Sequence, residues 1–132
     1  MKGTEKQMAF LRKLLEERGL SLEWAKEVSE IAGWSAGDLI NYLLQTKRNA
    51  DKEKIAKWVQ AKALMAVFEN TEKRIGKEGY FYFIPMFPDF VEMDTLRKAG
   101  QILSLFTKEN AKELKKSKEF TELVEEIKGG LS

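Results

Sequence analysis

Aromatic and lysine side chains are the residues of this sequence whose types and spacing point most directly to a chemistry. Trp58 follows Lys54 and precedes Lys62, so on a helix each lysine lies about 40° around the axis from the indole. An indole can stack on a nucleobase while neighbouring ammonium groups neutralise phosphates, which is what sequence-tolerant binding of a single strand requires. The sequence leaves an alternative equally open, in which Trp58 completes the core and the lysines extend past it into water.

A run of aromatic residues at positions 80–83 is the second such feature. On a strand, Tyr80 and Tyr82 share one face, and Phe81 and Phe83 share the other. The two tyrosines could form a stacking platform for bases, each stack contributing ~1–3 kcal/mol. Burial of both faces against helices or a second subunit is the competing interpretation. The run is similar to a strand of the RNA-recognition motif, but the βαββαβ order is absent, which excludes that fold.

Cationic side chains gather in two segments of a chain whose net charge is only +2. Residues 47–62 hold six cationic against two acidic side chains, and residues 108–118 hold five lysines against two glutamates. Such segments form either a basic patch or ordinary solvated helix faces. In the first segment we expect phosphate contacts from Lys47, Arg48, Lys54, Lys57 and Lys62.

Catalytic groups are sparse. The sequence has no cysteine and no histidine, which excludes thiolate nucleophiles, histidine bases and the common zinc sites. Asp89, Glu92 and Asp94 lie close together in the sequence, and Glu126 and Lys128 form an E-x-K triplet. A metal-dependent nuclease needs converging oxygens around Mg²⁺, which this arrangement does not suggest. We therefore expect a protein that is not an enzyme and has no metal or cofactor, and keep the nuclease as a third interpretation.

Capping residues and helical periodicity predict the elements that position these side chains. Thr4, Ser21, Ser35 and Asp51 are the expected starts of the first four helices, and the fourth extends to about residue 75. Helix resumes near residue 94, and the last helix runs to residue 128. Residues 61–68 are apolar on most sides apart from Lys62, which is typical of a helix buried all round or placed at a subunit contact.

A different pattern begins at Gly79. Residues 80–84 are β-prone, Pro85 and Pro88 bound a turn, and residues 90–93 can return as a second strand. The predicted fold is therefore mainly α: a single multi-helix domain over residues 1–132, with one short aromatic antiparallel β-hairpin at about residues 79–94. The hairpin and residues 61–68 present more apolar surface than one small domain easily covers, so we expect a homo-oligomer.

Composition indicates where such a protein works. Lys and Glu are abundant while Asn and Gln occur four times each, a bias reported for hyperthermophile proteins, although a mesophile with a charge-rich helical surface also fits. No apolar run reaches the ~18 residues of a membrane span, and the first residues lack the pattern of a signal peptide. We expect a cytoplasmic protein, from a thermophile, with no membrane partner.

Two resemblances accompany these patterns. Thr4-x-Lys6-Gln7 followed by residues 33–43 resembles a small helical motif that recurs in phage and plasmid replication and recombination proteins. The whole chain resembles the thermophile single-stranded DNA-binding proteins that lack an OB-fold, the ThermoDBP-related group. The likeness lies in its size, its helices, its short aromatic β element and its Lys/Glu-rich surface. This resemblance implies homo-oligomers that hold single strands in aromatic, basic grooves or tunnels.

These observations favour binding of single-stranded nucleic acid, DNA more than RNA, without sequence preference. The rival class is a protein-interaction module that uses the aromatic hairpin. The residues expected to contact nucleic acid are the five cationic residues above together with Trp58, Tyr80 and Tyr82.

Overall fold

Helices are the only regular elements in the part of the chain that this computed structural model describes. That part comprises the backbone of residues 1–81 and 89–129 and the side chains of residues 1–76 and 89–129. The helices are α1 (Glu5–Glu17), α2 (Leu22–Ala32), α3 (Ala36–Leu44), α4 (Lys52–Phe81), α5 (Met93–Ser104), α6 (Ala111–Lys115) and α7 (Lys118–Gly129).

The first helices begin where their capping residues predict. Thr4 Oγ1 accepts a hydrogen bond from the Gln7 amide at 3.1 Å, and the Gln7 side chain accepts one from the Thr4 amide, which completes a capping box. Ser35 and Asp38 form a second capping box at the start of α3. Ser21 caps α2. These starts are confirmed because each depends only on side chains within one turn of the cap.

The long helix α4 is interrupted at Gly76, where φ is 82° and ψ is 172°. This backbone conformation lies outside the helical region and is open to glycine at little cost. The sequence predicted that the helix would extend to about Ile75, and the interruption confirms that position. Helical backbone then resumes and continues to Phe81.

The predicted β-hairpin is wrong. Tyr80 and Phe81, the expected start of its first strand, are helical, and Met93, the expected end of its second strand, begins α5. Residues 90–92 form no regular element, and no strand occurs in residues 1–81 or 89–129. Residues 82–88, which include Tyr82, Phe83 and the predicted turn, lie outside the described residues.

The reason for the error is that β-propensity depends on context. The scale spans only ~1 kcal/mol and measures packing against neighbouring strands. An isolated two-stranded hairpin is marginal without a sheet or a helix to cover it. A short helix, by contrast, forms its backbone hydrogen bonds between residues four apart in the sequence and needs no distant partner strand.

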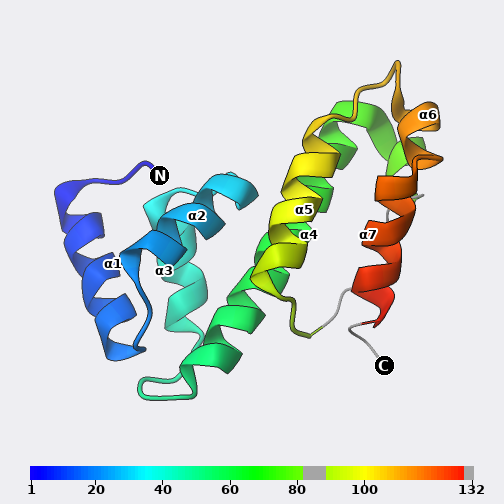
Figure 1. Cartoon of the computed structure of the whole chain (residues 1–132). Helices are drawn as coiled ribbons and strands as arrows, with labels where there is room; N and C mark the ends of the chain where they lie inside the picture. Colours follow the sequence, from blue (N-terminus) through cyan, green and yellow to red (C-terminus); the bar gives the residue numbers. More distant parts are fainter. Residues whose placement is uncertain (82–88, 130–132) are drawn as a thin grey trace.

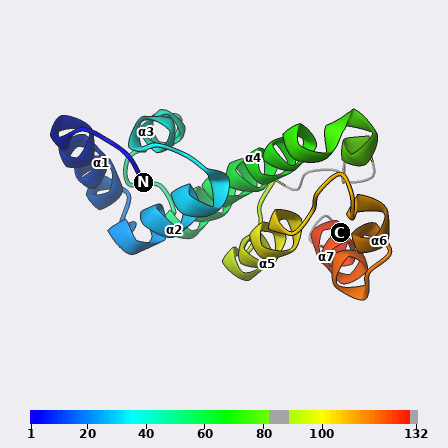
Figure 2. The same ribbon diagram turned by 90° about the horizontal axis from the view of Figure 1, so that it is seen from above.

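The helices are arranged around α4, as Figure 1 shows. Helix α2 packs on α4, α3 contacts α2, and α1 packs on α3, while α5 lies along α4. Helix α7 packs on the other side of α5, together with the short α6. Figure 2 shows that α4 runs from the group formed by α1, α2 and α3 to the group formed by α5, α6 and α7.

The apolar stretch at residues 61–68 lies where α4 contacts both α2 and α5. Five of its residues are buried: Ala61, Ala63, Leu64, Val67 and Phe68. They belong to one core that also includes Leu15, Val28, Leu96 and Leu123. Burial of this stretch, one of the two predicted outcomes, is therefore achieved by helices of the same chain.

Candidate functional site

The turn between α2 and α3 places the first aromatic ring of the site. Helix α2 ends at Gly33, whose φ of 71° lies in the left-handed region that glycine adopts without strain. The Trp34 amide then donates to the Ser29 carbonyl at 2.8 Å. From α4, the Asn70 side chain donates to the Ala32 carbonyl at 3.2 Å. The turn that carries Trp34 is therefore fixed by two hydrogen bonds, one from the Trp34 amide to α2 and one from Asn70 of α4.

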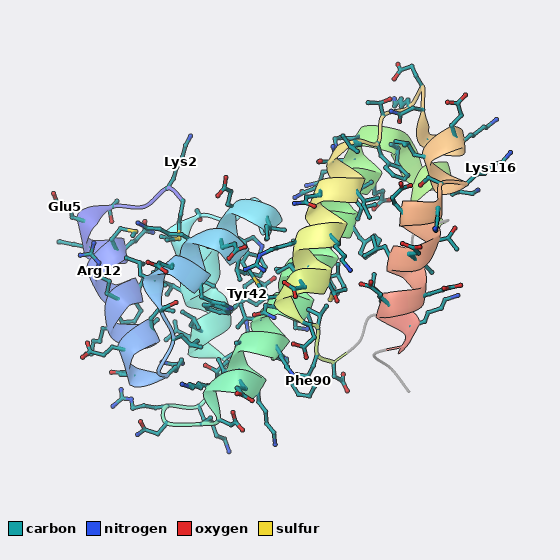
Figure 3. The ribbon with its side chains drawn as sticks, viewed as in Figure 1. Lys2, Glu5, Arg12, Tyr42, Phe90 and Lys116 are labelled. Carbon is teal, nitrogen blue, oxygen red and sulfur yellow. The ribbon has the colours of Figure 1, made fainter. Side chains whose placement is uncertain are left out.

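Three aromatic rings from different elements meet beside this turn, and we call them the aromatic row. Trp34 stacks on Tyr42 of α3, with ring centroids 4.5 Å apart and planes 22° from parallel. Tyr42 meets Trp58 of α4 edge to face, with centroids 6.3 Å apart. All three side chains are half-buried. Figure 3 shows Tyr42 among the side chains between α3 and α4.

Lysines of α4 flank the aromatic row as the helical spacing predicted. The Lys62 ammonium lies over the Trp58 indole, 5.3 Å from the ring centroid, which is within the range of a cation–π contact. Lys54, one turn before Trp58, is exposed. Neither lysine has an ion-pair partner among the described residues. Both ammonium groups are therefore available to a phosphate.

A hollow of about 230 Å³ opens beside the aromatic row. Two rings of the row form part of its wall, and the remaining lining comes from the end of α3 and the middle of α4. The lining residues are Trp34, Tyr42, Gln45, Lys62, Met65, Ala66 and Glu69. The hollow combines flat aromatic surface, an apolar patch and three polar side chains.

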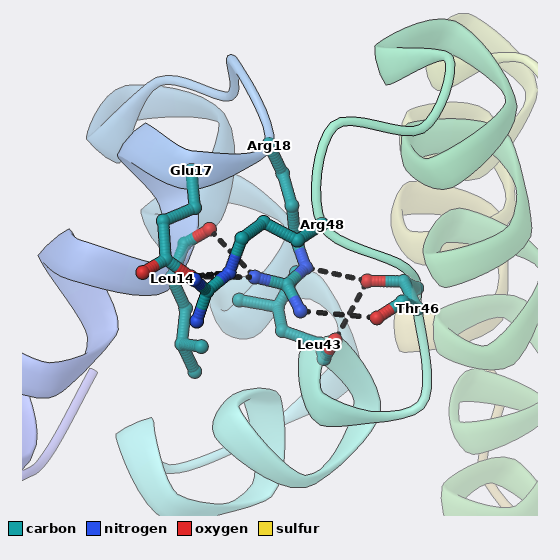
Figure 4. Close-up of polar contacts among 6 residues, drawn as sticks. All are labelled: Leu14, Glu17, Arg18, Leu43, Thr46 and Arg48. Atoms are coloured by element: carbon teal, nitrogen blue, oxygen red, sulfur yellow. Dashed lines mark hydrogen bonds and ion pairs between the residues drawn. The ribbon is translucent and has the colours of Figure 1, made fainter.

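The segment between α3 and α4, which carries two of the predicted cationic residues, is fixed to the end of α1. Arg18 is buried, and its guanidinium donates to the Thr46 hydroxyl, the Thr46 carbonyl and the Leu14 carbonyl at 2.6, 3.0 and 3.1 Å, as Figure 4 shows. Arg48 pairs with Glu17 at 3.3 Å. The basic segment is consequently held in place beside the aromatic row.

The remaining predicted site residues are less favourably placed. The Lys57 ammonium pairs with Glu92 at 2.6 Å, and this hydrogen bond, followed by charge attraction, raises the pKa of Lys57. Lys57 is therefore already neutralised in part. Lys47 is exposed in the segment before α4. The side chain of Tyr80 and all of Tyr82 lie outside the described residues, so the structure does not place them beside Trp58.

Sequence patterns did not single out Tyr42, Gln45 or Glu69, and they assigned Trp34 no binding role. A signal for Tyr42 was present, because it lies at the edge of the apolar stripe of α3 just as Trp58 lies at the edge of the stripe of α4. Two aromatic residues at such edges on consecutive helices can meet across the space between them. No local signal identified Gln45 or Glu69.

Three of the acidic residues singled out as a nuclease-like pattern are engaged in ion pairs. Glu92 pairs with Lys57, and Asp94 accepts from Arg97 at 2.7 Å. Glu126 of the E-x-K triplet pairs with Lys98 at 2.8 Å. Among residues 1–76 and 89–129, whose side chains the structure describes, no group of three acidic residues is arranged to hold a metal ion.

Exposed large apolar side chains occur on separate segments. Among the residues whose side chains the structure describes, and apart from Met1, they are Phe10 of α1, Leu44 at the end of α3, Phe90 before α5 and Leu105 after it. Figure 3 shows Phe90 near the start of α5, away from the α1 helix. The protein-interaction alternative relied on the hairpin, and with that element absent, these residues do not replace it as one surface.

Comparisons with known proteins add no identification. No protein-family model, curated protein or solved structure matches this chain. Within the described residues, no helix has the length and apolar character needed to cross a bilayer.

Proposed function

We propose that this chain binds single-stranded nucleic acid, DNA in preference to RNA, mainly without regard to base sequence. The observation that carries the proposal is the aromatic row, three half-buried rings beside which Lys54 and Lys62 lie on one face of α4, neither of them in an ion pair with another described residue. Rings that are partly exposed offer faces or edges for bases, and ammonium groups at this spacing can follow a phosphate backbone.

The contacts divide between stacking and charge. Trp58, Tyr42 and Trp34 provide stacking surface, and Lys54 and Lys62 provide phosphate contacts. Lys47 and Arg48 extend the cationic surface along the segment that Arg18 holds. Lys57 contributes less because Glu92 already neutralises it. Tyr80 and Tyr82 stay in the proposal as sequence-based expectations. The proposal assigns no catalytic residue, metal or cofactor.

The test is a fluorescence-anisotropy titration with labelled oligo-dT and oligo-rU, with a duplex of equal length as the control, at two salt concentrations. We expect binding to both single strands, tighter to oligo-dT, weak binding to the duplex, and an affinity that falls as salt rises. Absence of binding to both single strands, or equal affinity for the duplex, would contradict the proposal.

Three further sequence-based expectations belong to the same proposal: a cytoplasmic location, a thermophilic source and self-association. A thermophilic source predicts a Tm above the ~45–65 °C range of mesophile domains. Self-association predicts a light-scattering mass above the 15.2 kDa of one chain. A monomeric mass at micromolar concentration would contradict self-association and leave the binding proposal intact.

A further inference from the structure

The hollow beside the aromatic row has the size of a site for one flat ring system. Its volume of about 230 Å³ is below the ~300–1,000 Å³ of pockets that enclose a drug-sized ligand. Trp34 and Tyr42 supply an aromatic wall, and Met65 and Ala66 supply apolar contact. A base of a single strand bound along the aromatic row would reach this hollow without leaving the strand.

The polar groups that line the hollow are not satisfied by one another. Lys62 and Glu69 carry opposite charges, but Glu69 forms no ion pair or side-chain hydrogen bond within the described part of the chain. The Gln45 amide nitrogen donates to the Asn41 carbonyl at 3.2 Å, which leaves its oxygen as an acceptor. The hollow therefore presents acceptors from Gln45 and Glu69 and a donor from Lys62.

A carboxylate in this position selects against phosphate and in favour of a base edge that carries N–H groups. Guanine presents two neighbouring donors, its ring N–H and its exocyclic amino group, beside a carbonyl oxygen. An ionised carboxylate can accept from both donors, and a lysine can donate to the carbonyl. Adenine and inosine each lack part of this pattern, since adenine has no ring N–H or carbonyl and inosine has no exocyclic amino group.

From this match we infer that the hollow accepts one base of a bound single strand and favours guanine. Glu69 accepts from the guanine edge, and Lys62, whose ammonium has three donors, donates to the guanine carbonyl as well as to a phosphate. The inference rests on the proposed function and adds one base-reading position to an otherwise sequence-tolerant contact. The aromatic row stacks any base, because every base has a π face. Discrimination comes from the edge of the base that enters the hollow.

The experiment compares oligo-dT strands of one length that carry a single central guanine, inosine or adenine. We expect the guanine strand to bind more tightly than either of the others by about fivefold or more, the lower limit for a bidentate contact. The inosine strand is the most informative comparator, because it differs from guanine only by the exocyclic amino group. This comparison uses the unaltered protein, so it does not depend on the folding of any variant.

Two variants then assign the effect to Glu69. Glu69→Gln replaces one carboxylate oxygen by an NH2 group that cannot accept a hydrogen bond, and we expect the ratio of the affinities for the guanine and inosine strands to fall to about one. Glu53→Gln is the matched control, because it removes the same charge from an exposed position of α4 outside the hollow. We expect it to keep the full guanine preference.

The outcomes separate the inference from the proposed function. Equal affinity for the three central bases, with oligo-dT binding intact, contradicts the guanine site and leaves the proposed function standing. A preference that survives Glu69→Gln also contradicts the assignment. Failure of the protein to bind any of the strands contradicts both.

Discussion

The two basic segments carry similar local charge and differ in the aromatic rings beside them. In residues 47–62, Lys62 lies over the indole of Trp58, which meets Tyr42 and through it Trp34, and all three rings are half-buried. Residues 108–118 are flanked in the sequence by Phe106 and Phe120, which are buried and pack on each other with centroids 5.7 Å apart. Charge density by itself therefore does not distinguish a binding surface from a solvated helix face.

The surroundings of the two segments differ in a second way. The backbone before α4 is held by Arg18, which donates to the Thr46 carbonyl and hydroxyl. Near the other segment, Arg74 donates to the Leu103 and Ser104 carbonyls at the end of α5. Arg18 stabilises a segment that leads into a surface with lysines and aromatic rings. Arg74 hydrogen-bonds to the last carbonyls of α5, a helix that packs against α4.

The largest effect that we expect comes from the buried rings of the second region. Phe106→Ala should lower the free energy of unfolding by ~3–5 kcal/mol, because it removes a fully buried ring and leaves a cavity. Urea unfolding measures the change. Trp58→Ala should cost less, because its indole already contacts solvent. If Trp58→Ala proves equally destabilising, Trp58 is a packing residue and the contrast between the regions fails.

The next effect concerns the arginine that steadies the first segment. Arg18→Met keeps much of the side-chain volume but removes the donors that reach Thr46 and Leu14. We expect a loss of ~1.5–3 kcal/mol in the free energy of unfolding, the range for hydrogen bonds to charged groups. Arg48→Ala breaks an exposed ion pair and should cost no more than ~1 kcal/mol. Similar urea midpoints for the two variants would count against this role for Arg18.

Trp58 gives the sharpest test of stacking. Provided that its thermal unfolding shows a folded protein, Trp58→Ala should weaken oligo-dT binding by ~1–3 kcal/mol, the value of one stacked base. Its salt dependence should stay nearly the same, because no phosphate contact is removed. Trp24→Phe is the control, since it loses the indole hydrogen bond to Gln60 at 2.7 Å, away from the aromatic row. A folded Trp58→Ala protein that binds like the parent excludes Trp58 from the site.

The lysines should act on salt dependence, and only in the first segment. Lys54→Ala combined with Lys62→Ala should flatten the slope of log K against log salt by up to ~1.4, since each phosphate contact on a single strand contributes ~0.7. The matched pair Lys112→Ala and Lys116→Ala, both exposed in the second segment, should leave the slope unchanged. Titration of each double variant at several salt concentrations measures this slope. If both double variants flatten the slope equally, the two segments do not differ in phosphate binding.

The smallest effect concerns an ion pair between α2, which belongs to the α1–α3 group, and α5, which belongs to the α5–α7 group. Arg97 of α5 hydrogen-bonds to Glu27 of α2, and this contact lowers the pKa of Glu27. The folded chain therefore holds the Glu27 proton less tightly than the unfolded chain. The resulting stabilisation is present at neutral pH, and it is lost as the pH falls from the ordinary carboxyl pKa through the lowered one.

Urea midpoints of the parent and of Glu27→Gln measure this contribution. The parent should be slightly more stable at neutral pH, and the difference should vanish below the ordinary carboxyl range. A difference that persists unchanged at low pH would show that Glu27 acts through packing and not through its charge.

Local sequence was sufficient for the starts of the helices and for one interruption. Thr4, Ser21 and Ser35 cap amides within three residues of themselves, and Gly76 allows a backbone conformation that other residues resist. The buried apolar residues of α1, α2, α3, α5 and α7 recur at helical spacing, a pattern that is likewise contained within each helix. At Tyr80 and Phe81, residue propensity predicted a strand where the chain is helical. The prediction was wrong because a strand is stabilised by partner strands distant in the sequence, which propensity does not take into account.

The candidate site depends on contacts between residues far apart in the chain. Tyr42 contacts Trp34 and Trp58 only because α3 and α4 lie close together in the fold. The hollow is lined by Gln45 at the end of α3 and by Glu69 of α4. Lys57 and Lys62 looked alike in the sequence, yet packing paired Lys57 with Glu92 and placed Lys62 over an indole. Hydrogen bonds within one helical turn form between residues that are neighbours in the sequence, so the sequence predicts them. The partners of a surface side chain depend instead on which helices pack together in the core.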